Sequence, residues 1–516
     1  MSNVKKRNGF SSGIGFILAT AGSAIGLGNL WSFPYKTAKY GGAAYVFMYI
    51  IFVILIGTTV MIAELYIGKR AQANPVSAYK KVNKKVGWIG LFAVVIPFII
   101  VCYYSILGGY TVKFALNSFS GNSNIVNSFA GNVGEVILFT AIFVVLAVVI
   151  VMSGIKGGIE KASKVLMPIL FLILIAIAIY SLCLGEGVMQ GLDFYLNPKF
   201  SQLGFEGVLA SMSQAFFSLS LGMGIIASYG SYAGKEIKVG KSVTMVCIFD
   251  TLVALLAGLA IFPAVYHYQA INGGSNLRLD GVLLMFQTLP LVFESMGAFG
   301  SIVSLFFFSM IVIAALTSVI SLFEVVTQFV IQKFKVHRKK AILIVSAITF
   351  LISIPIGISL GFAMNGQNKL ILCQENLLDF FDLVTNNILM PLGALGACIT
   401  IGWLLEKPKK ARQRFSPMNL YRTLKEDGLD IGFFGKIFAV IVKYVTPLLI
   451  IFVEVFGIID IVNKKGMNGV GIILTALGIA IISIAIYFIF FQNKPTGTNE
   501  DELVIDEAVK KKAEQN

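Results

Sequence analysis

The chain has 516 residues, of which 57% are hydrophobic and 13% are charged, and its mean hydropathy is +0.84. Soluble domains carry about 25% charged residues, so this composition excludes an ordinary soluble protein and indicates a polytopic membrane protein. The five cysteines are scattered and odd in number, which argues against a disulfide framework, and the two histidines have no metal-ligand spacing.

Apolar runs long enough to cross a bilayer, about 20 residues each, predict twelve transmembrane helices. In chain order they are 13–36, 41–68, 88–115, 135–153, 165–184, 205–230, 242–266, 297–331, 341–362, 377–404, 438–461 and 467–491. The connections between them are too short to hold a soluble catalytic domain, which needs more than about 50 residues. We therefore predict an all-α membrane protein that is not an enzyme.

The net charge of +15 follows the predicted topology. Lysine and arginine gather in alternate connections, for example at 5–7, 80–85 and 335–340, whereas 118–134 has none. Because cytoplasmic loops carry an excess of basic residues, we expect both termini in the cytoplasm of a multi-pass plasma-membrane protein. The basic charge therefore reflects topology and does not indicate a nucleic-acid partner.

Two of the apolar runs contain a Gly-X-Gly interruption, Gly26-Leu27-Gly28 and Gly222-Met223-Gly224. Glycine costs about 1 kcal/mol in a helix interior, and membrane helices break only where the backbone lines an enclosed cavity. Two breaks in corresponding positions of two halves indicate a transporter built from repeats, with its site at the breaks. Close packing through small residues is the alternative; the serines and asparagine beside the glycines favour the breaks.

The segment 21–34, AGSAIGLGNLWSFP, resembles the helix 1 signature of the neurotransmitter:sodium symporters, of the LeuT-like bacterial type. The resemblance extends over nearly all of the chain. Further matches are Gly41-Gly42 and Glu64 in helix 2, Tyr103-Tyr104 in helix 3, 213–220 in helix 6, 315–318 in helix 8, and Asp379 with Asp382 in helix 10.

This family implies a LeuT-type fold, in which five helices are followed by five more in inverted topology and then by two extra helices. The predicted parts are a cytoplasmic segment 1–12, a first repeat 13–184, a second repeat 205–404, a cytoplasmic loop 405–437, helices 11 and 12 at 438–491, and a cytoplasmic tail 492–516.

A zwitterionic amino acid needs partners for both of its charges inside a membrane, and a broken helix offers free N–H and C=O groups. By resemblance, the N–H groups of Leu27 and Gly28 and the Tyr104 hydroxyl hold the carboxylate. Monoamine-selective relatives place an acid where this chain has Gly26, so the substrate must bring its own carboxylate. The carbonyls implied to hold the ammonium belong to Ala24, Phe217, Ser218 and Ser220.

The side-chain pocket implied by the resemblance is mostly apolar with a few hydroxyls. Its residues are Ile100, Phe217, Ser220, Met223, Ser318 and Leu322, and Ser23 is a further predicted substrate-binding residue. This pocket predicts a neutral substrate, an aliphatic or aromatic L-amino acid.

The resemblance also implies two sodium sites built from hard oxygen ligands. The first takes Ala24, Asn29, Ser218, a helix 7 residue and the substrate carboxylate. The second takes the carbonyls of Gly22, Ile25 and Ala314 and the hydroxyls of Thr317 and Ser318. These two hydroxyls could instead bond back to their own helix.

Asp250 lies in the apolar run of helix 7, and an intramembrane carboxylate is a functional candidate. Aligned on Gly258, Asp250 falls at the helix 7 ligand of the first sodium site; a local shift would make it a neighbour of that site. Chloride-dependent relatives bind an anion here, so we expect Asp250 to remove the chloride requirement.

Both gates depart from the family pattern. In the outer gate, Asp382 matches the acid, but the arginine position is Ser32, which leaves Lys36 or a water bridge to replace it. In the inner gate, Arg7 matches the cation, but the acid position is Gln332. We expect Glu64 to bond the broken backbones, with simple helix packing as the alternative.

The sequence therefore predicts a symporter that imports a neutral, hydrophobic L-amino acid with two sodium ions by alternating access, without chloride. Its partners are the substrate and the lipid bilayer, and a homodimer is left open. Two alternatives remain: a proton-coupled carrier of similar fold, and a receptor that binds an amino acid without transporting it, which the altered gates favour.

Overall fold

The computed structural model describes residues 9–119, 125–272, 284–367, 369–405, 416–426, 428–429, 431 and 434–493. Arg7, the part 406–415 of the loop 405–437 and nearly all of the tail 492–516, for which predictions were made above, lie outside these residues.

All secondary-structure elements in the described residues of the first half of the chain are helices. Its elements are α1 (Gly13–Ala24), η1 (Gly28–Ser32), α2 (Phe33–Lys39), α3 (Ala43–Phe52), η2 (Val53–Gly57), α4 (Thr58–Ala71), α5 (Pro75–Val82), η3 (Lys84–Val86), α6 (Gly87–Leu116), α7 (Ile125–Gly131), α8 (Val133–Met152), η4 (Ile155–Glu160) and α9 (Lys161–Leu182).

The second half adds one short antiparallel hairpin, in which Ile371 pairs with Asn376. Its elements are α10 (Val188–Leu196), η5 (Phe200–Gln202), α11 (Phe205–Ser218), α12 (Ile225–Ser231), α13 (Val239–Ile271), η6 (Leu284–Thr288), α15 (Leu289–Glu294), α16 (Ala298–Phe334), α17 (Arg338–Met364), β1 (Ile371–Leu372), β2 (Glu375–Asn376), α18 (Leu377–Val384), η7 (Thr385–Leu389), α19 (Met390–Ile399) and η8 (Thr400–Leu404).

The last described elements are a short helix within the predicted loop 405–437 and two long apolar segments, each made of consecutive helical elements. They are α20 (Pro417–Glu426), α21 (Phe434–Val440), η10 (Ile441–Val445), α22 (Thr446–Lys465), α23 (Met467–Ile486) and η11 (Tyr487–Phe491).

Among the described residues, ten helices are long and apolar enough to cross a bilayer, and a bent pair makes eleven. The bent pair is Gly13–Ala24 with Gly28–Lys39, at 48°. The run predicted at 205–230 is divided between α11 and α12. The helix predicted at 165–184 begins earlier, at Ile155. The prediction placed its start too late because the lysines near the true start resemble those of a loop.

The two predicted breaks are present, and local geometry explains the second. Gly222 and Gly224 have φ of +76° and +68°, which glycine adopts without steric cost. A Cβ at Gly224 would lie 2.7 Å from the Ala93 carbonyl oxygen, and one at Gly222 would collide with the Met390 carbonyl oxygen. Glycine is therefore required here both for conformation and for close approach.

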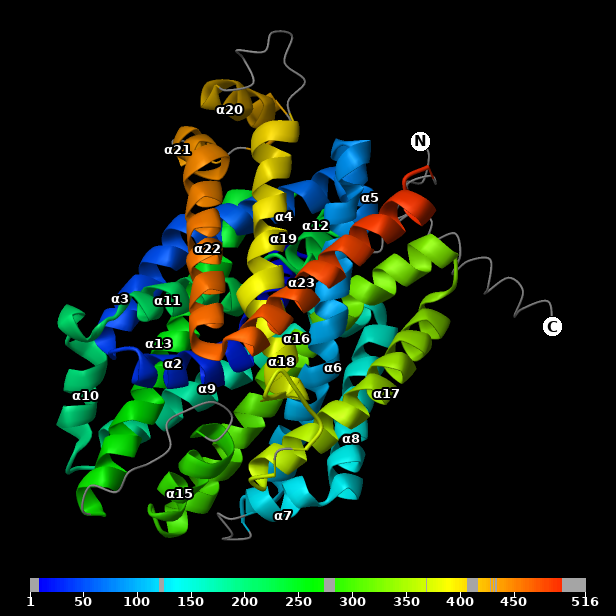
Figure 1. Ribbon diagram of the computed structural model, residues 1–516. Coiled ribbons are helices and arrows are strands. Elements are labelled where there is room, and N and C mark those ends of the chain that lie inside the picture. Colours follow the sequence, from blue (N-terminus) through cyan, green and yellow to red (C-terminus); the bar gives the residue numbers. More distant parts are fainter. Residues whose placement is uncertain are drawn as a thin grey trace.

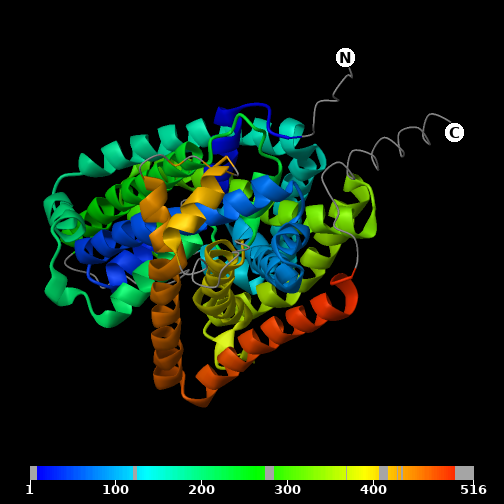
Figure 2. The same cartoon turned by 90° about the horizontal axis from the view of Figure 1, so that it is seen from above.

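α12, which follows the second break, lies among the other helices (Figure 1), and all of its residues are buried. α16 packs along α6, and α1 contacts α9, α13 and α16. α22 and α23 lie at the edge of the molecule (Figure 2), and α23 packs against α6 and α18. The site is therefore surrounded by long, continuous helices that support the interrupted ones.

Candidate functional site

The two helix breaks meet in the centre of the molecule. α1 ends at Ala24, where Ile25 takes an extended conformation, and α11 ends at Ser218. The Ser220 hydroxyl donates to the Ser23 carbonyl at 3.0 Å, which joins one break directly to the other. Ser220 itself has φ of +55°, a conformation that non-glycine residues rarely adopt. Free backbone groups from both helices therefore face a common space.

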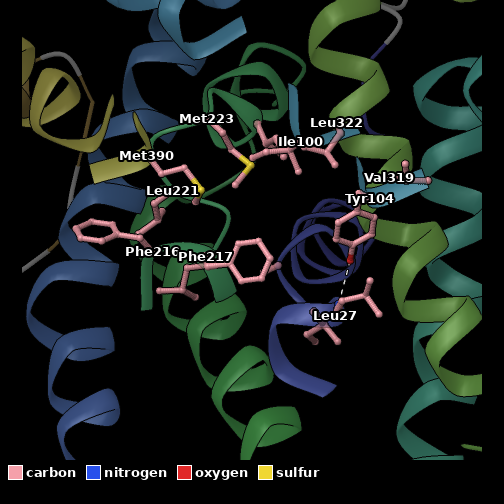
Figure 3. Close-up of a cluster of buried hydrophobic side chains, with 14 of the residues drawn as sticks. Leu27, Ile100, Tyr104, Phe216, Phe217, Leu221, Met223, Val319, Leu322 and Met390 are labelled. Carbon is pink, nitrogen blue, oxygen red and sulfur yellow. Dashed lines mark hydrogen bonds between the residues drawn. The ribbon is translucent and has the colours of Figure 1, made fainter. Parts of the chain in front are cut away.

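A cavity lies between the breaks, and the side chains around it come from four parts of the chain. It is lined by Ser23, Ala24, Gly26, Gly28, Ile100, Tyr104, Phe217, Ser220, Met223, Ile225, Ser318 and Leu322. Figure 3 shows Ile100, Met223, Leu322, Tyr104 and Phe217 gathered around this space. Every predicted substrate residue except Leu27 and Ser218 lines the cavity.

Sequence reasoning missed one lining residue, Ile225. The sequence clue to Ile225 was its position directly after the second glycine of the break, where α12 begins. The cavity wall is therefore more apolar than the predicted set alone suggested.

At one end of the cavity, the Tyr104 hydroxyl accepts a hydrogen bond from the Leu27 N–H at 2.9 Å (Figure 3). Beside it, a Cβ at Gly26 would lie 2.7 Å from the Tyr104 hydroxyl and would collide with the Ser318 hydroxyl. Position 26 therefore has no space for a side chain. This end offers hydroxyl and backbone groups, and among the described lining residues no acid that could bind a cationic group.

A polar cluster joins helices 1, 6 and 7 beside the cavity. The Asn29 amide donates to the Asp250 carboxylate at 2.8 Å and to the Ser218 hydroxyl at 3.0 Å. The other Asp250 oxygen accepts from Ser218 at 2.7 Å and from Tyr49 at 3.0 Å. The Asn29 side-chain oxygen accepts from the Gly26 N–H at 3.2 Å.

This cluster supplies the oxygen types that a sodium ion prefers, a carboxylate, an amide oxygen and a hydroxyl. Asp250 is fully buried and lies with Asn29 and Ser218, as the helix 7 alignment predicted. Tyr49 was not predicted. It is one of several aromatic residues in an apolar run, and only the packing of α3 against α11 brings it here.

A second group of oxygens lies between the end of α1 and α16. The Ser318 hydroxyl reaches the carbonyls of Ser23 at 3.2 Å and Ile25 at 3.4 Å. The Thr317 hydroxyl bonds back to the carbonyls of Ile313 at 3.1 Å and Ala314 at 3.0 Å. The Thr317 hydroxyl therefore bonds to its own helix, which was the alternative to an ion-binding role. The Ser318 hydroxyl instead bonds to carbonyls of helix 1.

The residues predicted for the second sodium site come from the end of α1 and from α16, and these contacts bring them close together. A Cβ at Gly22 would lie 3.4 Å from the Thr317 Cβ, which places the carbonyl end of α1 against this turn of α16. Carbonyl and hydroxyl oxygens are hard donors that suit a sodium ion.

Gln214 joins two residues of the predicted outer gate, Ser32 and Lys36. Its side-chain oxygen accepts from Lys36 at 3.1 Å and from Ser32 at 2.8 Å. Its amide donates to the Gly28 carbonyl at 2.7 Å. Gln214 lies in the helix 6 motif, but a neutral amide gave no signal as a gate residue.

Asp382, the predicted acid of the outer gate, bonds elsewhere. It accepts from the Asn386 amide at 2.5 Å and from Tyr103. Among the described residues, Lys36 and Asp382 form no ion pair. The lysine therefore does not replace the missing arginine by a direct contact.

At the position predicted for the acid of the inner gate, Gln332 joins α16 to the residue before α5. Its side-chain oxygen accepts from the Asn74 N–H at 2.9 Å and from the Asn74 amide at 2.8 Å. The buried acid in this region is Glu324, which forms an ion pair with Arg338. The Tyr232 hydroxyl donates to Glu324 at 2.9 Å, so the pair links α16 and α17 to the end of α12.

Sequence reasoning missed Glu324, although an acid within an apolar helix is a recognised signal. Arg338 also donates to the Val151 carbonyl at 2.8 Å, which connects the pair to α8. Nearer the cavity, Glu64 accepts from the Gly222 N–H at 2.8 Å, so this carboxylate supports the helix 6 break.

Comparisons with known proteins agree on one group. The model of the sodium:neurotransmitter symporter family matches residues 7–126 and 123–492. An uncharacterized sodium-dependent transporter of Bacillus subtilis, YhdH, is 34% identical over 467 residues, which cover 87% of this chain and 98% of that protein. An uncharacterized sodium-dependent transporter of Haemophilus influenzae is 32% identical over 478 residues, with coverage of 87% and 98%.

Among solved structures, the crystal structure of MhsT in complex with L-phenylalanine is similar, with a TM-score of 0.76 and 34% sequence identity. The match covers 87% of this chain and 99% of that chain.

Proposed function

Because this chain belongs to the sodium:neurotransmitter symporter family, a family of transporters rather than enzymes, we propose that it imports a neutral, hydrophobic L-amino acid with sodium ions. The predicted LeuT-type helical membrane fold is confirmed by the match to MhsT. Sodium dependence is the property that its similar relatives carry in their names. The substrate, the number of ions and the independence from chloride are our proposals.

The observation that carries the substrate proposal is the pair of facing helix breaks around an apolar cavity. One end offers backbone groups and the Tyr104 hydroxyl, and position 26 has no side chain. A substrate must therefore supply its own carboxylate, which distinguishes amino acids from simple amines. The apolar lining favours an apolar side chain, and the L-phenylalanine bound to MhsT belongs to this class.

We propose that two sodium ions bind beside this cavity. Asn29, Ser218, Asp250 and the Ala24 carbonyl would hold the first, next to the substrate carboxylate. Two ions moving through a 100 mV potential release about 4.6 kcal/mol, at about 2.3 kcal/mol per charge. At about 1.4 kcal/mol per decade, this energy supports more than about 10³-fold accumulation of a zwitterion.

The second ion would bind between α1 and α16. Its ligands would be the carbonyls of Gly22, Ile25 and Ala314 with the Thr317 and Ser318 hydroxyls. An ion there joins the broken helix 1 to a continuous helix, so ion binding favours one position of helix 1.

We propose that chloride is not required, because Asp250 already provides a negative charge at the first ion site. Three side chains donate to this carboxylate, Asn29, Ser218 and Tyr49. A fixed charge that is held by three donors leaves no electrostatic need for a mobile anion.

Alternating access requires that each side of the cavity can close. We propose that Lys36, Ser32 and Gln214 form the outer closure with Asp382 nearby, and that Glu324, Arg338 and Tyr232 contribute to the inner one. We further propose a plasma-membrane location with both termini in the cytoplasm, following the distribution of basic residues.

Uptake into proteoliposomes tests the proposal. The full chain is reconstituted, and uptake of radiolabelled L-phenylalanine and other neutral L-amino acids is measured under a sodium, potassium or proton gradient. We expect concentrative uptake of at least one of these amino acids only with sodium. Uptake driven by protons alone, or binding without uptake, would refute sodium symport and identify a proton-coupled carrier or a receptor.

A further inference from the structure

The residues that precede helix 1 are held by an acid from another helix. Glu160 ends η4, directly before α9, and its side chain is 1% exposed. Its Oε2 accepts from the Ser11 N–H at 2.7 Å. Its Oε1 accepts from the hydroxyls of Ser11 at 2.5 Å and of Ser12 at 3.3 Å. The Glu160 carboxylate therefore binds three donors from the two residues before α1.

Glu160 supplies a negative charge that the start of α1 does not have of its own. Ser12 is the N-cap of α1, and its hydroxyl accepts from the Gly15 N–H at 3.0 Å and donates to Glu160. The first turn of α1 contains no acid, although a negative charge is favourable at the N-terminus of a helix. A Cβ at Gly15 would collide with the Glu160 carboxylate, so the acid lies directly against this turn.

Aromatic packing joins the same segment, residues 9–12, to helix 6. The Phe10 ring centroid lies 5.1 Å from that of Phe16 and 5.6 Å from that of Tyr229. The Phe10 N–H donates to the Tyr232 carbonyl at 3.3 Å. Tyr232 is one of the residues proposed above for the inner closure, so segment 9–12 contacts that closure directly.

The position of this acid differs from the family pattern, which places an acid at the end of helix 8. This chain has Gln332 there, and Gln332 bonds to Asn74. Among the described residues, the acid that bonds to segment 9–12 is Glu160, at the start of helix 5.

Lys164 allows this contact to open without leaving a charge unpaired. Its ammonium lies 2.6 Å from the Glu160 carboxylate, one turn along helix 5, and its side chain is 38% exposed. A buried carboxylate without partners is costly, but Glu160 keeps Lys164 when segment 9–12 moves away. Opening therefore breaks the three charge-assisted hydrogen bonds to Ser11 and Ser12, and the ion pair remains.

We propose that Glu160 is a positioning residue that holds the cytoplasmic half of helix 1 against helix 5. We call Glu160, Ser11 and Ser12 the latch. Because α1 runs from the latch to Ala24 at the cavity, fixing its start fixes this half of helix 1, and release of the latch opens this side of the cavity. The inference rests on the proposed function, because a carrier that works by alternating access needs this side to open.

A cysteine reporter measures how readily this side opens. Ser228 in α12 is fully buried and precedes Tyr229, which packs against Phe10. The full chain with Ser228→Cys is reconstituted in liposomes and treated with N-ethylmaleimide. Peptide mass spectrometry follows the modification of residue 228 and separates it from the native cysteines.

The latch variants are made in this background, and melting curves confirm that each is folded. They are Ser11→Ala, Glu160→Gln, Glu160→Asp and the double variant of Ser11→Ala with Glu160→Gln. Glu135→Gln is the matched control, because Glu135 is also an acid that pairs with a lysine, Lys113, at 2.8 Å. It lies near the start of α8, at the end of that helix remote from η4.

We expect Glu160→Gln to raise the modification rate by about 10-fold or more, because hydrogen bonds to a charged group become neutral ones. Ser11→Ala keeps its backbone donor and should raise the rate by about threefold or more. The double variant should exceed Glu160→Gln by no more than about twofold, because both changes act on one contact. Glu160→Asp keeps the charge and should lie between wild type and Glu160→Gln, whereas Glu135→Gln should stay within about twofold of wild type.

The outcomes separate the latch from the proposed function. Ser11 is exposed, so Ser11→Ala provides the test if Glu160→Gln does not fold, and an unchanged rate in Ser11→Ala would refute the latch. Effects that multiply in the double variant, or an equal rise in Glu135→Gln, would also refute it. The assay needs neither an amino acid nor a sodium gradient. Absence of sodium-driven uptake by the wild type would therefore refute the proposed function, while the modification rates decide the latch.

Discussion

Asp250→Asn is a clean test of charge at the first ion site, because the hydrogen bonds around position 250 can survive the change. The introduced side chain could keep its oxygen towards the Asn29 amide, which donates to Asp250 at 2.8 Å. Its new NH₂ group would face Ser218 and Tyr49, whose hydroxyls can turn to accept. The substitution therefore removes the negative charge while the shape of the cluster is retained.

The size of the effect follows from that lost charge. Hydrogen bonds to a charged group contribute about 1.5–3 kcal/mol and neutral ones about 0.5–1.5 kcal/mol. A sodium ion that loses its charged ligand should lose the difference between these ranges, about 1–1.5 kcal/mol. At about 1.4 kcal/mol per decade, sodium affinity falls by about 5- to 12-fold.

The assay is amino acid uptake into proteoliposomes over a sodium titration, with chloride or gluconate as the anion. Uptake by the wild-type protein should be the same with either anion. Asp250→Asn should need more sodium and should recover part of its affinity in chloride, which would replace the missing charge. If wild-type uptake collapses in gluconate, Asp250 does not replace a bound anion, and our account of helix 7 is wrong.

Three further predictions follow from described contacts. Tyr104→Phe should weaken substrate binding by about 1.5–3 kcal/mol, the range for a hydrogen bond to a charged group; unchanged affinity in calorimetry would remove Tyr104 from the site. Gly26→Ala should weaken substrate binding by about 1–3 kcal/mol through overpacking, because the new Cβ meets two buried hydroxyls. If the variant binds substrate as tightly as the wild type, the cavity can rearrange to hold the methyl group. Arg338→Ala should destabilise the protein by about 3–5 kcal/mol, because it leaves Glu324 buried without its ion-pair partner. The control Lys464→Ala, which breaks an exposed ion pair of 2.6 Å with Glu206, should cost less than about 1 kcal/mol. Equal melting temperatures of the two variants would contradict this prediction.

Local sequence signals predicted the helix breaks because glycine has a backbone cost that a regular helix would avoid. The family resemblance, with helix 7 aligned on Gly258, grouped Asn29, Ser218 and Asp250 in one predicted ion site, and the structure brings these three side chains into contact. The LeuT-like resemblance then supplied the three-dimensional arrangement, and its fold is confirmed.

Three of the missed residues share a different property. Tyr49, Gln214 and Glu324 act through side chains of distant helices, as in the Tyr232–Glu324 bond at 2.9 Å. The sequence pattern of one helix does not reveal which residues of another helix its side chains will contact. Glu324 carried a signal of its own as an intramembrane acid, but its partner Arg338 lies in the next helix, and the pair became evident only from the fold.

The Gln214 bridge has a consequence for the speed of gating. Opening a gate made of two opposite charges means separating them, which costs up to about 4 kcal/mol at about 4 Å near a protein surface. Here the Lys36 ammonium leaves a neutral amide oxygen, 3.1 Å away, and a bond of this kind contributes about 1.5–3 kcal/mol. The cavity mouth should therefore open with a lower barrier and respond less to ionic strength than a mouth closed by an arginine and an aspartate.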